Sequence, residues 1–519
     1  MFEIYILYTY NDNLSGGKMK KPNILYFMSD DHTYNAISCY NGILSKVFKT
    51  PNLDRIANEG VRLDNFYSTN PICTPARATI MTGQYGQVSG VRTLDDHWEN
   101  CGELDLAKLM QNAGYQTALF GKWHLGIEPQ GFDKYSYLSG TPDNFRDTPK
   151  AGQQGVYRNP YFKSENQEFP KQYNGYVTDI ITDFAIDYLK NKEDKPFFMM
   201  CNHKAPHDFW DYPERHEHLF DNVDIPIPDT LFEDKGHRSI ASRNYGSSVT
   251  PRNKIRSLYE DFSKEDYVTG PLVCDENATF EEKGIAAYTK YIKDYCRTVK
   301  GVDDSVGTIL DYLEKTGEID NTIIIYTSDQ GMFLGEHDYQ DKRWSFEESL
   351  KSPMMIRYPK EIKAGTVSNK LMANIDVAPT LLDYANTEIP KEMQGESCRK
   401  MISGDYSGFI RESVYFRYWM HLAHRHNNPA HYGIRTQDYK LIFYYGLPLD
   451  ASGAVNEKSP SGWELYDVKN DPYETKNIYN DKKYTDIISE LKKQLDEIKV
   501  KYKDTDEQYP ELVALKNKG

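Results

Sequence analysis

Residues 68–83 have the sequence STNPICTPARATIMTG, and the rest of the chain is interpreted around them. An alternating run at residues 61–67 predicts a strand directly before this segment. Thr74 is predicted to cap a short helix that has Pro75 in its first turn and ends at Gly83. Cys73 would then lie at or just before the N-terminus of that helix.

This placement gives Cys73 two interpretations. The unpaired N–H groups and the dipole of a helix N-terminus favour a thiolate or a bound anion, and Arg77 lies one turn further on the same side. Together these features predict a site for an anionic substrate. A lone cysteine near a helix start is, however, more often a small buried hydrophobic residue. The rest of the chain has to distinguish the two.

Length and composition indicate a globular protein with more than one core. At 519 residues the chain is too long for one simple core, so we expect a large domain and a smaller one. Hydrophobic residues make up 39% and charged residues 27%, which is typical of folded proteins. The net charge of −15 argues against nucleic acid as a partner. No apolar run approaches the length of a membrane span.

The N-terminus and the cysteines indicate the cellular compartment in which the protein resides. The first residues are apolar but have no basic region and no small-residue cleavage site, so they do not resemble a signal peptide. The seven cysteines are odd in number and lack metal or disulfide spacing, which suits a reducing compartment. We therefore expect a cytoplasmic protein, with the periplasm or secretion as alternatives. Residues 1–20 are expected to be an N-terminal extension, because Met19 directly precedes the first strand.

The pattern of apolar runs predicts an α/β fold over residues 21–400. Continuous apolar runs, as in buried parallel strands, occur at residues 23–28, 117–120, 196–201, 322–326 and 353–358. Helical periodicity occurs at 53–60, 105–114, 177–191, 278–316 and 376–385. We expect a large, mixed, mostly parallel sheet flanked by helices. Residues 127–175 are expected to be loops, and residues 208–275 an irregular insertion over the active face.

After about residue 400 the pattern changes. Residues 432–436, 440–445 and 463–466 predict antiparallel strands, and residues 484–501 predict a charged amphipathic helix. Residues 401–519 are therefore expected to form a smaller α+β subdomain that carries an antiparallel sheet.

Polar residues follow the predicted strands where the strands end. They are Asp30 and Asp31, Lys122 and His124, His203 and His207, and Asp329 and Gln330. In a parallel sheet these ends meet at one edge, where such folds bind ligands. Asp30, Asp31, Asp329 and Gln330 would offer four hard oxygen ligands, which suit Ca²⁺ or Mg²⁺ and not zinc. Each motif alone also fits an ordinary solvated turn; the ordered set favours a site.

The same set resembles a known family. Cys73-Thr74-Pro75-Ala76-Arg77 is similar to the C-x-P-x-R signature of type I sulfatases of the alkaline phosphatase superfamily, and the resemblance extends from Lys21 to about Tyr479. It implies an alkaline phosphatase-like fold and oxidation of Cys73 to formylglycine by a maturase. It also implies that the formylglycine hydrate attacks sulfur, forms a covalent sulfate intermediate and then releases sulfate.

The resemblance assigns roles to the candidate residues. Asp30, Asp31, Asp329 and Gln330 would bind Ca²⁺, with Mg²⁺ as the alternative, together with the oxygen of formylglycine at position 73. Arg77 would position the hydrate, and His124 would assist proton transfer on it. Three residues would hold sulfate oxygens: Lys122, His203 and Lys342. Gln330 departs from the family, because many members have Asn or His at this position.

Further segments indicate the substrate class. Residues 341–343, 347–349 and 426–435 resemble bacterial sulfatases that act on 6-O-sulfated N-acetylglucosamine in host glycans, either mucin or glycosaminoglycan. Asp341 and Arg343 would bridge sugar hydroxyls, and His207 or His431 would line the sugar pocket. An equally weighted interpretation is that these residues only order the loops. The oligomeric state cannot be predicted.

Two other functions compete with a glycan sulfatase. One is a phosphonate or phosphate monoester hydrolase of the same superfamily, which shares the sheet and the metal ligands. The other is a non-catalytic glycan-binding protein, which is disfavoured because no catalytic position has been lost.

Overall fold

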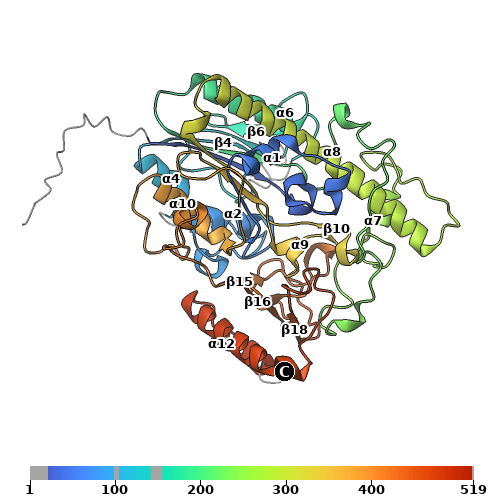
Figure 1. The fold of residues 1–519 in the computed structure, drawn as a ribbon. Coiled ribbons are helices and arrows are strands. Elements are labelled where there is room, and N and C mark those ends of the chain that lie inside the picture. Colours follow the sequence, from blue (N-terminus) through green and yellow to red (C-terminus); the bar gives the residue numbers. More distant parts are fainter. Residues whose placement is uncertain (1–20, 99–103, 142–154, 517–519) are drawn as a thin grey trace, which may run out of the picture.

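A ten-stranded sheet lies at the centre of the computed structural model, which describes residues 21–98, 104–141 and 155–516 (Figure 1). Its strands follow the order β13-β2-β12-β9-β1-β8-β4-β5-β6-β7. The expected extension at residues 1–20 lies outside the described residues. In chain order the strands are β1 (Asn23–Ser29), β2 (Val61–Leu63), β4 (Gln116–Gly121), β5 (Lys134–Ser139), β6 (Tyr161–Ser164), β7 (Lys171–Gln172), β8 (Phe197–His203), β9 (Thr322–Ser328), β12 (Met354–Arg357) and β13 (Thr366–Ser368).

The middle of the sheet is parallel and its margins are mixed. Strands β9, β1, β8, β4 and β5 run parallel to one another. On one side β12 is antiparallel to both β9 and β2, and on the other side β6 and β7 are antiparallel. The predicted class, a large mixed and mostly parallel α/β sheet flanked by helices, is confirmed.

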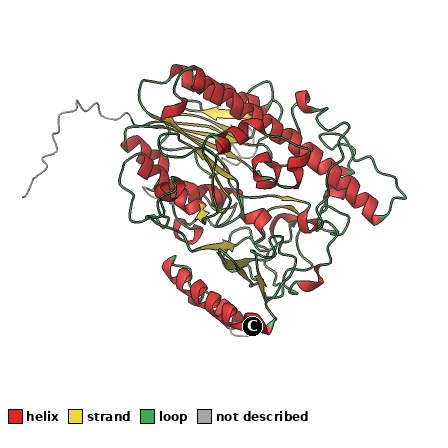
Figure 2. Ribbon diagram, in the orientation of Figure 1, coloured by secondary structure: helices red, strands yellow, loops and turns green. Residues whose placement is uncertain are grey.

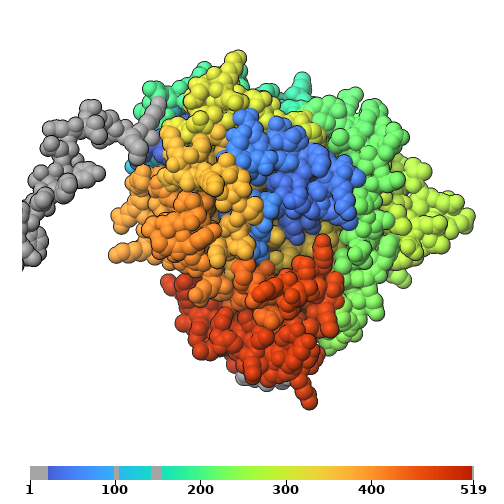
Figure 3. Space-filling model, in the orientation of Figure 1, coloured from blue at the N-terminus to red at the C-terminus, as the bar shows by residue number. Residues whose placement is uncertain are grey.

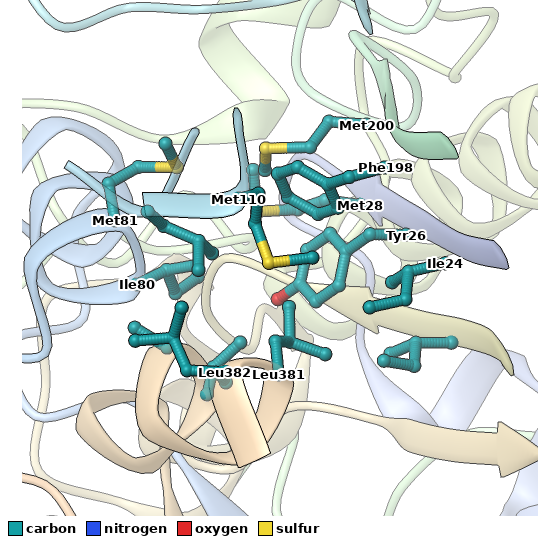
Figure 4. Close-up of a cluster of buried hydrophobic side chains, with 14 of the residues drawn as sticks. Ile24, Tyr26, Met28, Ile80, Met81, Met110, Phe198, Met200, Leu381 and Leu382 are labelled. Atoms are coloured by element: carbon teal, nitrogen blue, oxygen red, sulfur yellow. The ribbon is translucent and has the colours of Figure 1, made fainter. Parts of the chain in front are cut away.

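Central strands read as continuous apolar runs because both faces of the sheet are buried. In β1, Ile24, Tyr26 and Met28 face one hydrophobic cluster, while Leu25 and Phe27 face another. Figure 4 shows the first cluster, where β1 and β8 pack against three helices. These helices are α2 (Cys73–Thr82), α4 (Leu106–Asn112) and α10 (Val377–Tyr384).

The opposite face of the sheet is covered by α1 (Pro51–Asn58), α6 (Val177–Asn191) and α8 (Phe280–Lys315) (Figure 2). Thr279 and Glu282 form a capping box at the start of α8, so each side chain bonds a backbone N–H that the helix leaves unpaired. Among the described residues, no helix combines the length and apolar character needed to cross a bilayer, and the 36-residue α8 is amphipathic.

The C-terminal part is a second layer against this body. Four antiparallel strands, with α12 (Thr485–Lys501) packed on them, share one hydrophobic cluster with aromatic residues of the segment 333–350. Figure 3 shows the C-terminal residues as a red block that adjoins the green insertion. The predicted antiparallel sheet is confirmed. Its strands are β15 (Ser413–Tyr418), β16 (His431–Thr436), β17 (Lys440–Tyr444) and β18 (Gly462–Tyr466).

Smaller elements complete the described chain. They are β3 (Phe66–Tyr67), α3 (Gly86–Ser89), α7 (Leu258–Phe262), β10 (Phe333–Leu334), β11 (Gln340–Asp341), α9 (Glu347–Leu350), β14 (Met372–Ala373), α11 (Arg399–Ile402) and α13 (Pro510–Lys516).

Three local predictions were wrong. The strand expected over residues 61–67 is split into β2 and β3, which belong to different sheets. The segment 127–175, expected to be loops, contributes β5, β6 and β7 where it is described. Thr74 does not cap α2, because the helix begins at Cys73 with Ile72 as its N-cap and the Thr74 hydroxyl donates to the carbonyl of His124 instead. Gly83 does end the helix, in a left-handed conformation.

The central core predicts a large cost for truncating Phe198 of β8, which is fully buried against α2, α4 and α10. We expect Phe198→Ala to destabilise the protein by about 3–5 kcal/mol, because it removes buried apolar contacts and leaves a cavity. Val367→Ala is the matched control, since Val367 of the edge strand β13 is 52% exposed. Calorimetry of both variants tests the expectation, and equal unfolding midpoints would contradict it.

Candidate active site

Parallel pairing brings four chain segments to one edge of the sheet. Ser29, the last residue of β1, pairs with His203 of β8 and with Ser328 of β9. Gly121 of β4 pairs with Asn202 of β8. The residues that follow these strand ends therefore emerge at the same level, as predicted. They are Asp30 and Asp31, Lys122, the segment 204–208, and Asp329 and Gln330.

Three carboxylates share one buried space at this edge. Asp30, Asp31 and Asp329 are almost inaccessible to solvent, and ligand oxygens from all three lie within 4.8 Å of one another. Burial raises the pKa of Asp329 to about 7, and the negative charge of Asp30 acts in the same direction against the opposing effect of Arg77. Burial also opposes ionisation of Asp30, but Lys122, His207 and Arg77 outweigh it and hold that pKa well below its ordinary value.

Cationic side chains from three different segments neutralise these carboxylates. Lys122 Nζ contacts Asp30 Oδ2, and Lys342 Nζ donates to Asp31 Oδ2 at 2.5 Å. Arg77 Nε donates to Asp329 Oδ2 at 3.0 Å, and Arg77 Nη2 lies 2.9 Å from the same oxygen. Burial would deprotonate Lys342, but the charge of Asp31 outweighs burial and holds its pKa well above the ordinary value. The expected grouping of Arg77, Lys122 and Lys342 around position 73 is present.

Cys73 begins α2 within this group of charges. Its Sγ lies 3.3 Å from Asp30 Oδ1, 3.8 Å from Lys122 Nζ and 3.6 Å from Gln330 Nε2. Burial and the negative charge of Asp30 raise the thiol pKa. The expectation that the helix N-terminus favours a thiolate was therefore wrong, because burial and the adjacent carboxylate outweigh the helix dipole.

The residues present fit a divalent cation. Three carboxylates converge, and Gln330 Oε1 is buried without a hydrogen-bond partner among the described residues. Gln330 Nε2 donates to Asp31 Oδ1 at 2.6 Å, so the amide already faces the carboxylates. Because a Gln amide can turn about its last bond, Oε1 can take the inner position and complete a set of hard oxygen donors.

The two histidines at the end of β8 and in the turn that follows it lie in different places. His207 Nε2 lies 3.6 Å from Asp31 Oδ2, and a His207 ring nitrogen, Asp30 and Cys73 all offer ligand atoms within 4.8 Å of one another. His203 instead faces away: its Nε2 lies 2.9 Å from Ser305 Oγ of α8, and its ring stacks on Phe27. Burial lowers the pKa of His203 to about 3, so its ring is neutral. The structure thus places His207 at the position expected for His203.

His124 lies close to the same group. Its Nδ1 is buried without a partner in the described part of the chain, and its carbonyl accepts the bond from Thr74. Burial and the positive charges of Lys122 and Arg77 hold its pKa well below the ordinary value. His124 therefore offers a neutral imidazole, which can accept a proton.

A second polar group lies beside the first. Arg343 Nε donates to Asp341 Oδ2 at 3.0 Å, and the same carboxylate oxygen lies 3.0 Å from His426 Nδ1. Lys342, between the two predicted sugar contacts, bonds Asp31. The predicted pair Asp341 and Arg343 is thus brought against the charged centre. His426 belongs to the segment 426–435 that was compared with bacterial sulfatases, but it was not predicted as a site residue. The density of histidines in and before that segment was the signal that could have identified it.

His431 does not belong to this surface. It is fully buried in β16, its ring stacks on Tyr418 and Trp344, and its Nδ1 bonds the carbonyl of Pro429. The expectation that it lines a sugar pocket does not fit this placement, because aromatic rings of the C-terminal sheet enclose the imidazole.

Several site residues occupy the left-handed region of the backbone. Asp31, His124, Asp341 and Arg343 have φ angles of 63°, 60°, 75° and 78°. This conformation is costly for residues with a Cβ atom, and it persists only where surrounding contacts impose it. A cavity of about 810 Å³ lies away from this group of charges, where residues of α4, β4 and α6 line it at the other end of the strands.

Comparison with known proteins agrees with this geometry. A family model described as "Sulfatase" matches residues 22–387, and one described as "N-sulphoglucosamine sulphohydrolase, C-terminal" matches residues 335–501. The chain is 40% identical to the N-acetylglucosamine-6-O-sulfatase of Bacteroides thetaiotaomicron, across 96% of this chain and 89% of that protein.

Two solved structures extend the comparison. One is of a protein in complex with its substrate D-glucosamine-2-N,6-O-disulfate; it is 38% identical, has a TM-score of 0.81, and the match covers 95% of this chain and 100% of that one. The other is a phosphonate monoester hydrolase from Silicibacter pomeroyi, with a TM-score of 0.67 and 19% identity over 93% and 96% of the two chains. The second likeness shows the fold alone.

The buried ion pair between Arg77 and Asp329 predicts a larger loss of stability on truncation of the arginine than an exposed ion pair does. Arg77→Ala leaves the carboxylate of Asp329 buried without its arginine, so we expect a loss of about 3–5 kcal/mol in the free energy of unfolding. The control is Arg55→Ala, because Arg55 pairs with carboxylates that are 39–74% exposed and exposed pairs contribute less than about 1 kcal/mol. Thermal unfolding of the cysteine form of each variant measures the difference; similar losses would contradict this account.

Proposed function

Since this chain belongs to the sulfatase family, we propose that it hydrolyses the 6-O-sulfate ester of N-acetylglucosamine in host glycans, either mucin or glycosaminoglycan. The general activity, sulfuric ester hydrolysis on a carbohydrate, follows from the family match and the named relatives. The sugar and the position rest on one observation: the chain is 40% identical, over nearly its whole length, to a protein of that specificity.

The charges of the site support an anionic substrate. Arg77, Lys122 and Lys342 offset the three carboxylates Asp30, Asp31 and Asp329. A divalent cation added to this balanced set leaves a local positive charge, which attracts a sulfate group despite the net charge of −15. We propose Ca²⁺ as the ion, because all four donors are protein oxygens and Mg²⁺ usually keeps several waters.

The resident groups of the family supply part of the chemistry. A formylglycine made from Cys73 supplies the nucleophilic oxygen, and the cation supplies positive charge at the sulfate oxygens. Asp30, Asp31, Asp329 and Gln330 would hold the cation. Lys122 and Lys342 would bind the sulfate oxygens, and Arg77 would fix the side chain at position 73 in line with sulfur.

Two histidines would move protons. His207 would donate a proton from Nε2 to the ester oxygen as the alcohol departs, since it, and not His203, lies against Cys73 and Asp31. His124 would take a proton from the side chain at position 73 at Nδ1, which has no hydrogen-bond partner among the described residues. Asp341 and Arg343 would bridge sugar hydroxyls, because their backbone conformation and mutual bond hold both beside the centre.

A panel of substrates tests the proposed specificity. The enzyme, co-expressed with a formylglycine-generating maturase, is compared on 6-O-sulfated N-acetylglucosamine, on its 3-O- and 4-O-sulfated isomers, on 6-O-sulfated galactose and on phenyl phosphonate. We expect kcat/KM to be at least about 10²-fold higher on the first substrate, because sites that bond substrate hydroxyls discriminate strongly. Preference for another sulfated sugar would refute the specificity, and preference for phenyl phosphonate would also refute the reaction.

Conversion of Cys73 by a maturase is tested on the same material. Mass spectrometry of the peptide that contains residue 73 should show formylglycine, and Cys73→Ala should abolish turnover. Turnover by the fully unconverted thiol would contradict the proposed nucleophile.

Cation binding has a readout that does not require activity. Added Ca²⁺ should raise the unfolding temperature of the cysteine form, because a ligand that binds only the folded state contributes about 2.7 kcal/mol at 100 times its Kd. Asp329→Asn should remove most of this rise. Asp311→Asn should keep it, since Asp311 is exposed on the surface of the molecule. The same rise in all three proteins would exclude this site.

A further inference from the structure

Asp208 contacts the side of the His207 ring that faces away from the charged centre. His207 Nδ1 lies 2.6 Å from Asp208 Oδ1 and 2.9 Å from the backbone carbonyl of Asp208. The other ring nitrogen, Nε2, points to the opposite side, where it lies 3.6 Å from Asp31 Oδ2 and close to Cys73. The ring therefore bridges the charged centre and an acidic residue that has no assigned part in the reaction.

The backbone around this pair is fixed from several sides. The hydroxyl of Tyr157 donates to the carbonyl of His207 at 2.5 Å, and Lys204 Nζ donates to the carbonyl of Asp208 at 3.3 Å. The turn itself is closed by the N–H of His207, which donates to the carbonyl of Lys204 at 3.0 Å. Lys204 Nζ also lies over the ring of Tyr157, 4.9 Å from its centroid. These contacts fix the backbone of both residues of the pair.

The second carboxylate oxygen of Asp208 contacts Arg256, which lies on the side of the site where the sugar is proposed to bind. Arg256, from the insertion at residues 208–275, places Nη2 at 3.4 Å from Asp208 Oδ2 and Nη1 at 2.5 Å from His426 Nε2. His426 Nδ1 lies 3.0 Å from Asp341 Oδ2. Because Arg256 only donates, His426 Nε2 accepts, and the ring hydrogen of His426 lies on Nδ1, the nitrogen that is 3.0 Å from Asp341 Oδ2. One chain of polar contacts thus joins His207 to the residues proposed to bind the sugar.

We propose that Asp208 is a positioning residue of the hydrolysis: it accepts the Nδ1–H of His207, so that Nε2–H is the group aimed at the ester oxygen of the substrate, and Arg256 holds Asp208 in that orientation. This inference rests on the proposed role of His207 as proton donor. It assigns the carboxylate the orienting role that the aspartate has in a Ser-His-Asp triad, although the reaction and the fold are different.

The step that depends on this arrangement is departure of the alcohol. As sulfur forms a bond to the oxygen of the nucleophile, its bond to the bridging oxygen of the sugar breaks and the electron pair stays on that oxygen. The proton moves from His207 Nε2 to the bridging oxygen and gives the neutral alcohol. The imidazole becomes neutral and keeps its Nδ1–H bonded to Asp208. Without the carboxylate, the ring loses the partner that fixes its orientation.

The dependence on the leaving group distinguishes this role from a structural one. A sugar alcohol is a poor leaving group that needs a proton, whereas 4-nitrophenolate departs without one. We expect Asp208→Asn to lower kcat on 6-O-sulfated N-acetylglucosamine about 10²-fold, with KM changed less than about 3-fold, and to lower kcat on 4-nitrophenyl sulfate less than about 5-fold. The rates are normalised to the formylglycine content of each preparation.

Three further variants complete the test. His207→Asn should show the same substrate-dependent loss, and the double variant should lose little more than either single one, because the two residues act as a unit. Asp211→Asn is the matched control, since Asp211 lies in the same loop but pairs with Arg158. Equal losses on both substrates, or no loss on the sugar sulfate, would overturn the proposal.

Failure of the specificity and failure of this inference are distinguishable. The wild-type protein alone reports which sugar sulfate is hydrolysed, and the ratio of variant to wild type on that sugar reports the role of Asp208. The unconverted cysteine form gives an independent readout through NMR of ¹⁵N-labelled histidine, with the His207 signals identified by their loss in His207→Asn. These signals should shift in Asp208→Asn and stay unchanged in Asp211→Asn; no shift in Asp208→Asn would refute the contact itself.

Discussion

Burial of three carboxylates at one edge of the sheet is the constraint on which the rest of the site depends. Removing Asp30, Asp31 and Asp329 from water is unfavourable unless positive charge accompanies them. Lys122 from the end of β4, Arg77 from α2 and Lys342 from the segment after β11 supply that charge. The folded chain is thereby required to bring separate segments to one point, and the same cations then surround the position where an anionic substrate has to lie.

The site is completed by two segments that lie outside the central sheet. The insertion at residues 208–275 contributes Arg256, and the histidine-rich segment between β15 and β16 contributes His426. Arg256 contacts His426, and His426 lies against Asp341, next to the centre. The aromatic residues of segment 333–350 share their hydrophobic cluster with the C-terminal sheet, so the loop that carries Asp341, Lys342 and Arg343 is held between the two layers. The residues proposed to bind the sugar and the charged centre therefore depend on a common packing.

Much of this arrangement was predictable where burial leaves a clear pattern. The strands β1, β8 and β9 are buried on both faces and read as unbroken apolar runs, and the polar residues at their ends therefore identified the edge that carries the site. The strands β5 and β15 were missed because charged or polar residues interrupt them. Arg417 in β15, for example, is buried only because Asp504 from the C-terminal tail pairs with it.

The part of the site that could not be predicted from the sequence depends on contacts between residues that are distant in the chain. His203 and His207 are four positions apart, and nothing in the sequence states which one faces Cys73. A turn between them directs one to Ser305 and the other to Asp31. Arg256 and His426 lie 170 positions apart and have no local pattern that joins them. Their pairing appears only when the insertion and the C-terminal sheet are packed together.

The burial of Cys73 has a consequence for the order of events during synthesis. Its side chain is 1% exposed, at the start of a helix whose residues are all buried. An enzyme that modifies Cys73 needs access to this side chain, and the folded chain does not offer that access. If Cys73 is the residue that is converted, as proposed above, the conversion would have to precede closure of the sheet edge. A chain that folded first would then keep its cysteine, so the speed of folding would compete with activation.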